Sequence, residues 1–127
     1  MTRTGLQLFL VTILLAIATS INAQNIDETI GGLWDIGDRD NSKVEFTLTE
    51  DGLWQGIITE TEVARSVGKL LFKKGVYDAE ENSIVGVLIH PDSGFGVSGT
   101  LTLETPTKLK AHAQKFFISR TFYWERL

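Results

Sequence analysis

The residues of this chain that are best suited to acid–base chemistry are its two histidines, His90 and His112. An imidazole titrates near neutral pH, so either side chain is able to act as a general base or as a metal ligand. Asp92 stands two positions after His90 and would complete a hydrolase-type site at the open mouth of the fold. The histidines lack the close spacing of a metal chelate. We therefore expect both on the surface, with no catalytic, metal-binding or cofactor-binding residue, and keep a hydrolase-type enzyme using His90 or His112 as an alternative.

Two loops resemble known functional motifs but lack the residues that those motifs require. Segment 38–41, Asp-Arg-Asp-Asn, is acidic like a calcium loop, but it has neither the glycine at the sharp turn nor the bidentate glutamate at the twelfth position. Segment 92–94, Asp-Ser-Gly, lacks the Gly-x-Ser-x-Gly elbow of a serine hydrolase. The absence of cysteine also excludes disulfides, thiolate metal sites and a cysteine nucleophile. We interpret both loops as hairpin turns.

The charge of the chain argues against a nucleic-acid partner. It has 12 basic and 16 acidic residues, for a formal net charge of −4. Lysines gather only at 73–74 and over 108–115, and no basic stripe is present that would neutralise a phosphate backbone. With 127 residues, 43% of them hydrophobic, the chain is long enough for one domain with a core and too short for two.

The amino-terminal segment has the three parts of a secretory signal peptide. Arg3 is followed by an almost unbroken apolar run over 6–18, and small residues then precede Gln24. A transmembrane anchor is the second interpretation, because the run is shorter than the ~20 residues that span a bilayer as a helix. The expected location is the periplasm or the cell exterior, with no membrane span once the signal is removed.

The predicted domain boundary follows from this signal. We expect a signal peptide over 1–23, cleavage between Ala23 and Gln24, and one β-barrel domain over 24–127. Cleavage after Ala18 is the alternative.

Alternation of apolar and polar residues predicts an all-β fold for the rest of the chain. Segment 43–49 places Val44, Phe46 and Leu48 on one face and polar residues on the other, as a half-buried strand requires. Eight strands of this kind are expected, with short turns and no long helical pattern between them. The expected strands are 32–37, 43–49, 53–59, 69–78, 83–90, 95–104, 108–114 and 116–127.

Two of the expected turns have strong local signals. Asp51 and Gly52 lie in a short hairpin loop, in which glycine takes the left-handed conformation. In the second turn, Pro91 fixes φ, Asp92 follows it, and Gly94 is free to adopt a positive φ. Consecutive hairpins make neighbouring strands antiparallel, which predicts a barrel or a sandwich, and we expect an up-and-down barrel.

Three further segments carry less regular patterns. Residues 25–30 predict a single helical turn before the first strand, with Asn25 as its cap. Residues 60–67 fit either one helical turn or an irregular crossing. Gly75 predicts a β-bulge. An exposed aromatic patch for a partner or a glycan could be formed by Trp54, Tyr77, Phe116, Phe117 and Tyr123, but we expect these residues in the core or at the barrel rim.

The first and last strands carry motifs that resemble the calycins, the lipocalin-like barrels. The first motif is Gly32-Leu33-Trp34 and the second is Trp124-Glu125-Arg126. In calycins a short helical turn precedes a Gly-x-Trp motif on the first strand, and a basic residue at the end of the last strand packs over the indole. The resemblance implies that Gly32, Trp34, Trp124 and Arg126 close the barrel. A guanidinium on an indole face is worth roughly 0.5–2 kcal/mol, and closure of a barrel requires this pairing of first and last strands.

The chain also resembles the bacterial family called domain of unknown function 2147 over essentially all of 24–127. Besides the two closing motifs, the resemblance rests on Asp51-Gly52 and on Ile89-His90-Pro91 with Ser93-Gly94. Typical members carry an Asp-x-x-Asn-Pro-type loop in the middle, whereas segment 60–67 has neither asparagine nor proline. The family carries no assigned activity.

The expected fold limits what the protein can hold. An eight-stranded barrel has an interior just wide enough for packed side chains or for one small ligand. We therefore expect an exported, non-catalytic binding module for a small apolar ligand or for an envelope protein partner. A structural envelope protein without a ligand is the alternative, and an interior filled by side chains would exclude the ligand.

Overall fold

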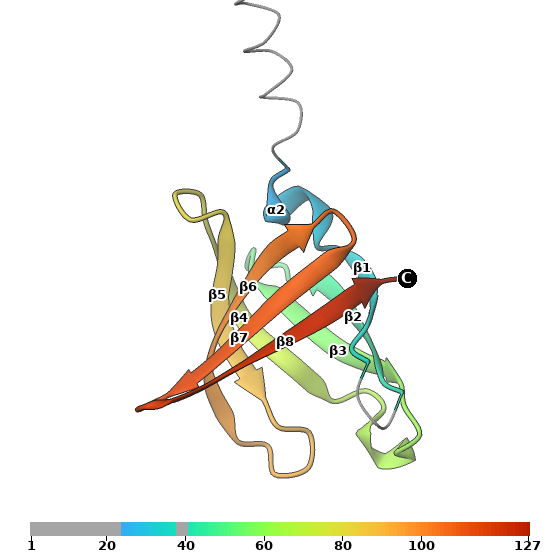
Figure 1. The fold of residues 1–127 in the computed structure, drawn as a ribbon. Helices are drawn as coiled ribbons and strands as arrows, with labels where there is room; N and C mark the ends of the chain where they lie inside the picture. The colour runs from blue at the N-terminus through green and yellow to red at the C-terminus, as the bar shows by residue number, and fades with distance from the viewer. Residues whose placement is uncertain (1–23, 38–40) are drawn as a thin grey trace, which may run out of the picture.

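Eight antiparallel strands close into a barrel in the computed structural model, which describes residues 24–37 and 41–127 (Figure 1). Each strand pairs with its neighbours in the sequence, and β1 pairs with β8. The strands are β1 (Gly32–Asp35), β2 (Lys43–Leu48), β3 (Trp54–Glu60), β4 (Leu70–Asp78), β5 (Ser83–Ile89), β6 (Gly96–Thr105), β7 (Lys108–Lys115) and β8 (Ile118–Arg126). The predicted all-β, eight-stranded, up-and-down barrel is confirmed. The predicted signal peptide, Ala23 and residues 38–40 of the acidic loop lie outside the described residues.

The strand boundaries differ from the prediction mainly at turns. β1 ends at Asp35 rather than at residue 37. Segment 60–67 contains one turn of 3-10 helix, η1 (Ala64–Ser66), as the first of its two interpretations predicted. The last strand does not begin at residue 116, because Phe116 and Phe117 form the two-residue turn beyond the final pair of the β7–β8 ladder. The prediction that these two phenylalanines pack in the core or at the rim is therefore wrong.

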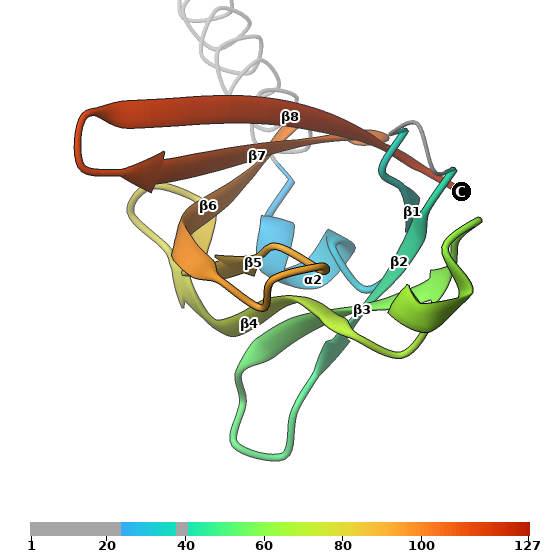
Figure 2. The same cartoon turned by 90° about the horizontal axis from the view of Figure 1, so that it is seen from below.

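A short helix, α2 (Ile26–Thr29), plugs one end of the barrel. Figure 2, seen from below, shows α2 within the ring of strands, and Ile26 is fully buried. Asn25 occupies the N-cap position, but its side chain makes no capping hydrogen bond, so that part of the prediction is wrong. Asn82, in the β4–β5 turn, takes over the role: its Oδ1 accepts from the Ile26 N–H at 3.0 Å, and its Nδ2 donates to the Gln24 carbonyl at 2.8 Å.

Large side chains fill the half of the barrel next to α2. Trp34, Phe46 and Phe72 are at most 1% exposed, and the Phe46 ring lies 6.1 Å from the Phe72 ring and 6.2 Å from the Trp124 ring. Tilted aromatic pairs at such distances contribute about 0.5–1.5 kcal/mol beyond the burial of their area. The other members of this buried core are Ile26, Ile30, Val44, Trp54, Ile58, Ile84, Leu88, Leu101, Leu109, Ala111 and Trp124.

Glycines let β4 and β5 pass close to this core. The register of β4 shifts between Lys73 and Val76 against β5, and Lys74 takes a φ of 56°, which is the bulge predicted from Gly75. A Cβ at Gly86 would lie 2.6 Å from the Lys73 carbonyl oxygen and 2.7 Å from Phe72 Cζ. There is therefore no room for a side chain at position 86, and the close approach of β4 and β5 at the bulge requires glycine there.

The ends of the barrel wall meet at Trp34 and Arg126. The two residues are register partners between β1 and β8, and Arg126 Cζ lies 4.4 Å from the centre of the Trp34 ring. The Arg126 guanidinium also donates to the carbonyls of Thr29 and Gly31, while Trp34 Nε1 donates to the Ile30 carbonyl at 2.8 Å. One cation thus joins the last strand, the first strand and the end of α2. Gly32 takes a φ of 113°, which L side chains rarely adopt, and Trp124 is 4% exposed in the core beside this seam.

Candidate ligand-binding site

The barrel has a cavity at the end opposite α2. Its volume is about 540 Å³, which lies within the range of roughly 300–1,000 Å³ that is usual for small-molecule sites. β8 contributes Arg120, Phe122 and Trp124, which alternate along the strand and so lie on its inward face. Apolar residues from four other strands, together with Ile36 just after β1, complete the wall: Leu71, Leu88, Ile89, Val97 and Ala113.

Core residues form the floor of the cavity, and small residues on β6 and β7 make it wide. Trp124 and Leu88, which are 4% and 8% exposed, separate the cavity from the filled half of the barrel. On the β6–β7 wall, Ala113 faces Gly99 as its register partner. A Cβ at Gly99 would lie only 2.6 Å from Leu88 Cγ. Because Gly99 has no side chain, Leu88 packs directly against the backbone of β6. The small side chain of Ala113 on β7 leaves space for the cavity next to this contact.

Arg120 gives this apolar cavity a positive charge. The part of the chain that the structure describes contains no ion pair of Arg120 with a carboxylate. Asp92, the acidic residue that also lines the cavity, lies 3.6 Å from Arg65 Nη2, and this contact offsets its charge. Lys69 Nζ donates to the Pro91 carbonyl at 3.1 Å on the same rim. The mouth therefore combines apolar walls with an excess of positive charge beside β8.

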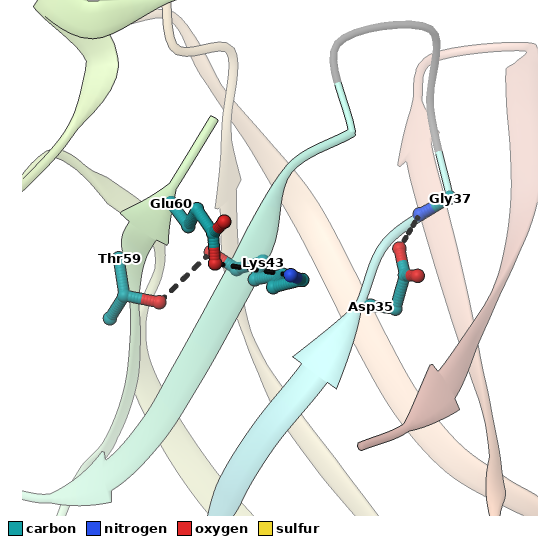
Figure 3. A network of polar contacts seen from close by, with 5 residues as sticks. All are labelled: Asp35, Gly37, Lys43, Thr59 and Glu60. Atoms are coloured by element: carbon teal, nitrogen blue, oxygen red, sulfur yellow. Dashed lines mark hydrogen bonds and ion pairs between the residues drawn. The ribbon is translucent and has the colours of Figure 1, made fainter. Parts of the chain in front are cut away.

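The rim formed by β1, β2 and β3 has an ion pair and a turn closed by a carboxylate. Figure 3 shows Lys43 Nζ beside Glu60 Oε2, at 3.1 Å, and Thr59 Oγ1 donating to the Lys43 carbonyl at 3.4 Å. Across β1 in the same view, Asp35 Oδ1 accepts from the Gly37 N–H at 2.8 Å, which turns the chain out of the strand. Asp35 and Glu60 are thus both engaged with groups on their own side of the mouth, away from Arg120 on β8.

The two histidines lie in different places and do not form one site. His112 lies on the outer face of β7, where its Nδ1 is 3.2 Å from Thr121 Oγ1. His90 is exposed on the rim of the cavity, where its Nδ1 accepts from the Asp92 N–H at 3.3 Å. In the described ranges neither imidazole contacts a carboxylate, and no group of three metal-ligating side chains is found. Within the described residues, His90 thus stabilises the turn after β5 and His112 joins β7 to β8, and neither forms a hydrogen-bonded pair with an acid.

The two hairpin turns singled out in the sequence lie at opposite ends of the barrel. Gly52, which follows Asp51 at the α2 end, takes a φ of 80°, and its N–H donates to the Thr49 carbonyl at 2.9 Å. Gly94, in the loop of Pro91 and Asp92, takes a φ of 73°, and its N–H donates to the His90 carbonyl at 2.8 Å. The second loop is therefore ordered by its own backbone and forms a fixed part of the cavity rim.

Sequence analysis missed the residues that give the cavity its character. Arg120 and Phe122 alternate with Trp124 along the last strand, so all three lie on the same face. A charged residue on the face that also carries a core tryptophan was the sequence signal for this site. Phe95, which is 52% exposed, stands at the rim beneath Lys115, whose Nζ lies 3.6 Å from the centre of its ring. No local pattern indicates that contact, because it joins the β5–β6 loop to the end of β7.

Comparisons with protein-family models, with curated proteins and with solved structures found no match to this chain. The resemblance to the family called domain of unknown function 2147 thus stays a prediction. Across residues 24–37 and 41–127, no helix is long and apolar enough to cross a bilayer. The geometry of the cavity is consequently the observation on which a functional proposal rests.

Proposed function

We propose that this protein is an exported, non-catalytic binding module that takes a small, largely apolar molecule into the open end of its barrel. The observation that supports this function is the cavity of about 540 Å³ above Trp124 and Leu88. The cavity is open to solvent and its walls are largely apolar, so a small apolar molecule would cover surface that otherwise faces water. Export is proposed from the signal-like segment over 1–23, and a lipocalin-like relationship from the closing motifs.

The charge at the mouth defines the class of ligand more closely. Arg120 lines the cavity beside Phe122 and has no acidic partner in the described residues. A ligand with an apolar body and one anionic end would place the body against the aromatic wall and the anion near the guanidinium. Arginine suits this role because its charge is permanent and its planar fork matches a carboxylate or a phosphate. We therefore propose an amphipathic anion as the preferred ligand.

The test is a displacement titration on the purified protein. A naphthalene-sulfonate dye that brightens in apolar sites is bound first, and decanoate or decanol is then used to displace it. We expect decanoate to compete more strongly than decanol. Arg120→Gln should reduce this preference on the order of fivefold, since a charge-assisted contact is weakened at a partly exposed mouth.

A filling variant separates the cavity from the outer surface. Ala113→Phe places a ring in the cavity and should abolish dye binding, whereas Gln114→Phe, its neighbour on the outer face, should leave it unchanged. Equal binding by both variants would place the dye elsewhere and refute the proposal. Native mass spectrometry of protein from its own host then tests for a bound small molecule. If no dye, acid or alcohol binds, a structural envelope protein without a ligand becomes the better description.

A further inference from the structure

The tip of the β7–β8 hairpin is the most apolar exposed feature of the described chain. Phe116, Phe117 and Ile118 are 83%, 105% and 72% exposed. Both views show this hairpin reaching beyond the ring of the other strands (Figures 1 and 2). Isolated apolar residues on a surface are common, but three adjacent ones on a projecting tip mark a contact site. We call residues 115–118 the hairpin tip.

The turn itself does not explain why these residues are aromatic. Lys115 and Ile118 are the last register pair, so Phe116 and Phe117 form a two-residue turn. Phe116 takes a φ of 54°, which lies in the left-handed region. Turns of this kind favour Gly, Asn or Asp, because a bulky side chain is strained there. Phe117 has no positive φ, so the turn needs the left-handed conformation only at its first position, where glycine is preferred. A sequence optimised only for the hairpin would carry glycine at position 116, which indicates that the two rings serve a contact outside the barrel.

The charges around the hairpin tip are of one sign. Residues 112–123 contain Lys115 and Arg120 and no carboxylate, in a chain whose formal net charge is −4. Lys115 Nζ lies over the Phe95 ring at 3.6 Å and stands 5.7 Å from the centre of the Phe116 ring. The apolar tip is therefore flanked by cations while the protein as a whole is acidic. Such a combination matches an anionic, partly apolar surface.

The shape of the hairpin tip favours a bilayer over a protein groove. A stable protein interface buries roughly 800 Å² on each partner, and a turn of two phenylalanines flanked by one isoleucine offers only part of that area. A convex wedge of rings without hydrogen-bonding groups can instead enter the boundary between lipid headgroups and acyl chains, while lysine and arginine stay among the headgroups. We infer that the hairpin tip docks the protein on an anionic phospholipid surface, whether or not the cavity holds a ligand.

Docking in this manner would place the cavity mouth beside the lipid. Phe95 belongs both to the rim of the cavity and to the contact with Lys115, and Arg120 lines the cavity two positions after Ile118. The two features therefore share one side of the barrel, while α2 plugs the other end. A molecule leaving a bilayer at the hairpin tip would meet the apolar wall of β8 next.

The test measures binding of the full protein to vesicles. We expect cosedimentation with vesicles of equal phosphatidylglycerol and phosphatidylcholine at low salt, and little with phosphatidylcholine alone. The double variant Phe116→Gly, Phe117→Asn places glycine at the position with the positive φ and removes both rings, so it should lose at least tenfold in affinity while melting no lower than the parent. Leu48→Asn removes an exposed apolar residue at the other end of the barrel and should bind normally.

Two further measurements separate the contributions of charge and insertion. Lys115→Gln combined with Arg120→Gln should remove the preference for the anionic vesicles. Phe117→Trp adds one exposed indole to a protein whose three tryptophans are at most 8% exposed, so its emission should shift to the blue when vesicles are added. Equal vesicle binding by the parent and the double variant Phe116→Gly, Phe117→Asn, or no binding by the parent, overturns the inference. Capture of a protein partner by the hairpin tip without any vesicle binding overturns it as well.

Discussion

Replacement of Arg126 should destabilise the barrel at its seam, because this side chain of β8 contacts both β1 and the end of α2. Its guanidinium lies over the Trp34 ring at 4.4 Å and donates to the carbonyls of Thr29 and Gly31. A hydrogen bond from a charged group is worth about 1.5–3 kcal/mol when shielded, and the contact with the indole about 0.5–2 kcal/mol. Arg126 is only partly buried, so we take the lower ends and expect Arg126→Ala to cost about 2–4 kcal/mol.

The contact with the ring can be isolated by a double-mutant cycle. Trp34→Leu removes the indole but keeps an apolar residue in the core, and the double variant with Arg126→Ala completes the cycle. Each single substitution removes the contact between the guanidinium and the indole, so this contact is the one that contributes to the coupling energy. We expect a coupling energy of about 1 kcal/mol, which does not include the hydrogen bonds to Thr29 and Gly31. Urea unfolding followed by circular dichroism gives the four free energies of unfolding, with the slope of each transition checked for two-state behaviour.

A cation over an exposed ring provides the matched control. Lys108 Nζ lies 5.5 Å from the Tyr123 ring and 3.9 Å from Glu125 Oε1 on the outer wall, where solvent screens both contacts. Lys108→Ala should therefore change the free energy of unfolding by no more than about 0.5 kcal/mol. A coupling between Trp34 and Arg126 below about 0.3 kcal/mol would mean that their energies add, and would refute the view that this pair holds the two ends of the wall together.

Two further predictions concern the strands around the bulge and the anchoring of α2. Gly86→Ala should lower the free energy of unfolding by about 1–3 kcal/mol, because the new methyl group would meet the Lys73 carbonyl oxygen at 2.6 Å; Gly31→Ala, whose nearest contact would be 3.7 Å, should be close to neutral in the same urea titration. Asn82→Gly should cost about 1–2 kcal/mol through loss of the hydrogen bonds to Ile26 and Gln24, and hydrogen exchange at the Ile26 amide should speed up. Unchanged exchange at that amide would show that Asn82 does not hold α2 in place.

The fold of this protein was predictable because its strands and turns are specified by patterns within short segments of the sequence. In the segment 43–49, apolar and polar residues alternate without a break, and the pattern locates β2 to within one residue. Gly52 and Gly94 mark turns that need a positive φ, and both glycines have one. Eight strands joined by short turns then leave few arrangements other than a closed antiparallel barrel.

The failures have a common physical origin in contacts between distant segments. Asn25 has the right residue type and position to cap α2, but Asn82, far along the chain, reaches the Ile26 N–H instead. The alternating pattern of the last strand includes Phe116 and so predicts a strand over 116–127, whereas the register of β7 with β8 places Phe116 and Phe117 in the turn. Local propensity cannot predict which of two such competing contacts forms.

The cavity was beyond sequence reasoning for a similar reason. Whether a barrel interior is full depends on which side chains meet at the same height, and that depends on register and on strand tilt. Gly99 and Ala113 become partners only in the folded sheet, and together they leave the mouth open. The inward position of Arg120 was available from alternation along the last strand, but the absence of an acidic partner among residues 24–37 and 41–127 could be seen only in the folded structure.

The seam formed by Arg126 also sets the order of events in folding. Arg126 is 97 positions from Thr29 and 95 positions from Gly31 in the sequence, so its contacts close nearly the largest loop that the described chain allows. Contacts of such separation form late, because the entropy of loop closure is lost before they contribute. A nascent chain that still lacks β8 has two unpaired strand edges and lacks the hydrogen bonds from Arg126 to the end of α2. We therefore expect the barrel to remain open and pliable throughout synthesis and to become rigid only when its final strand arrives.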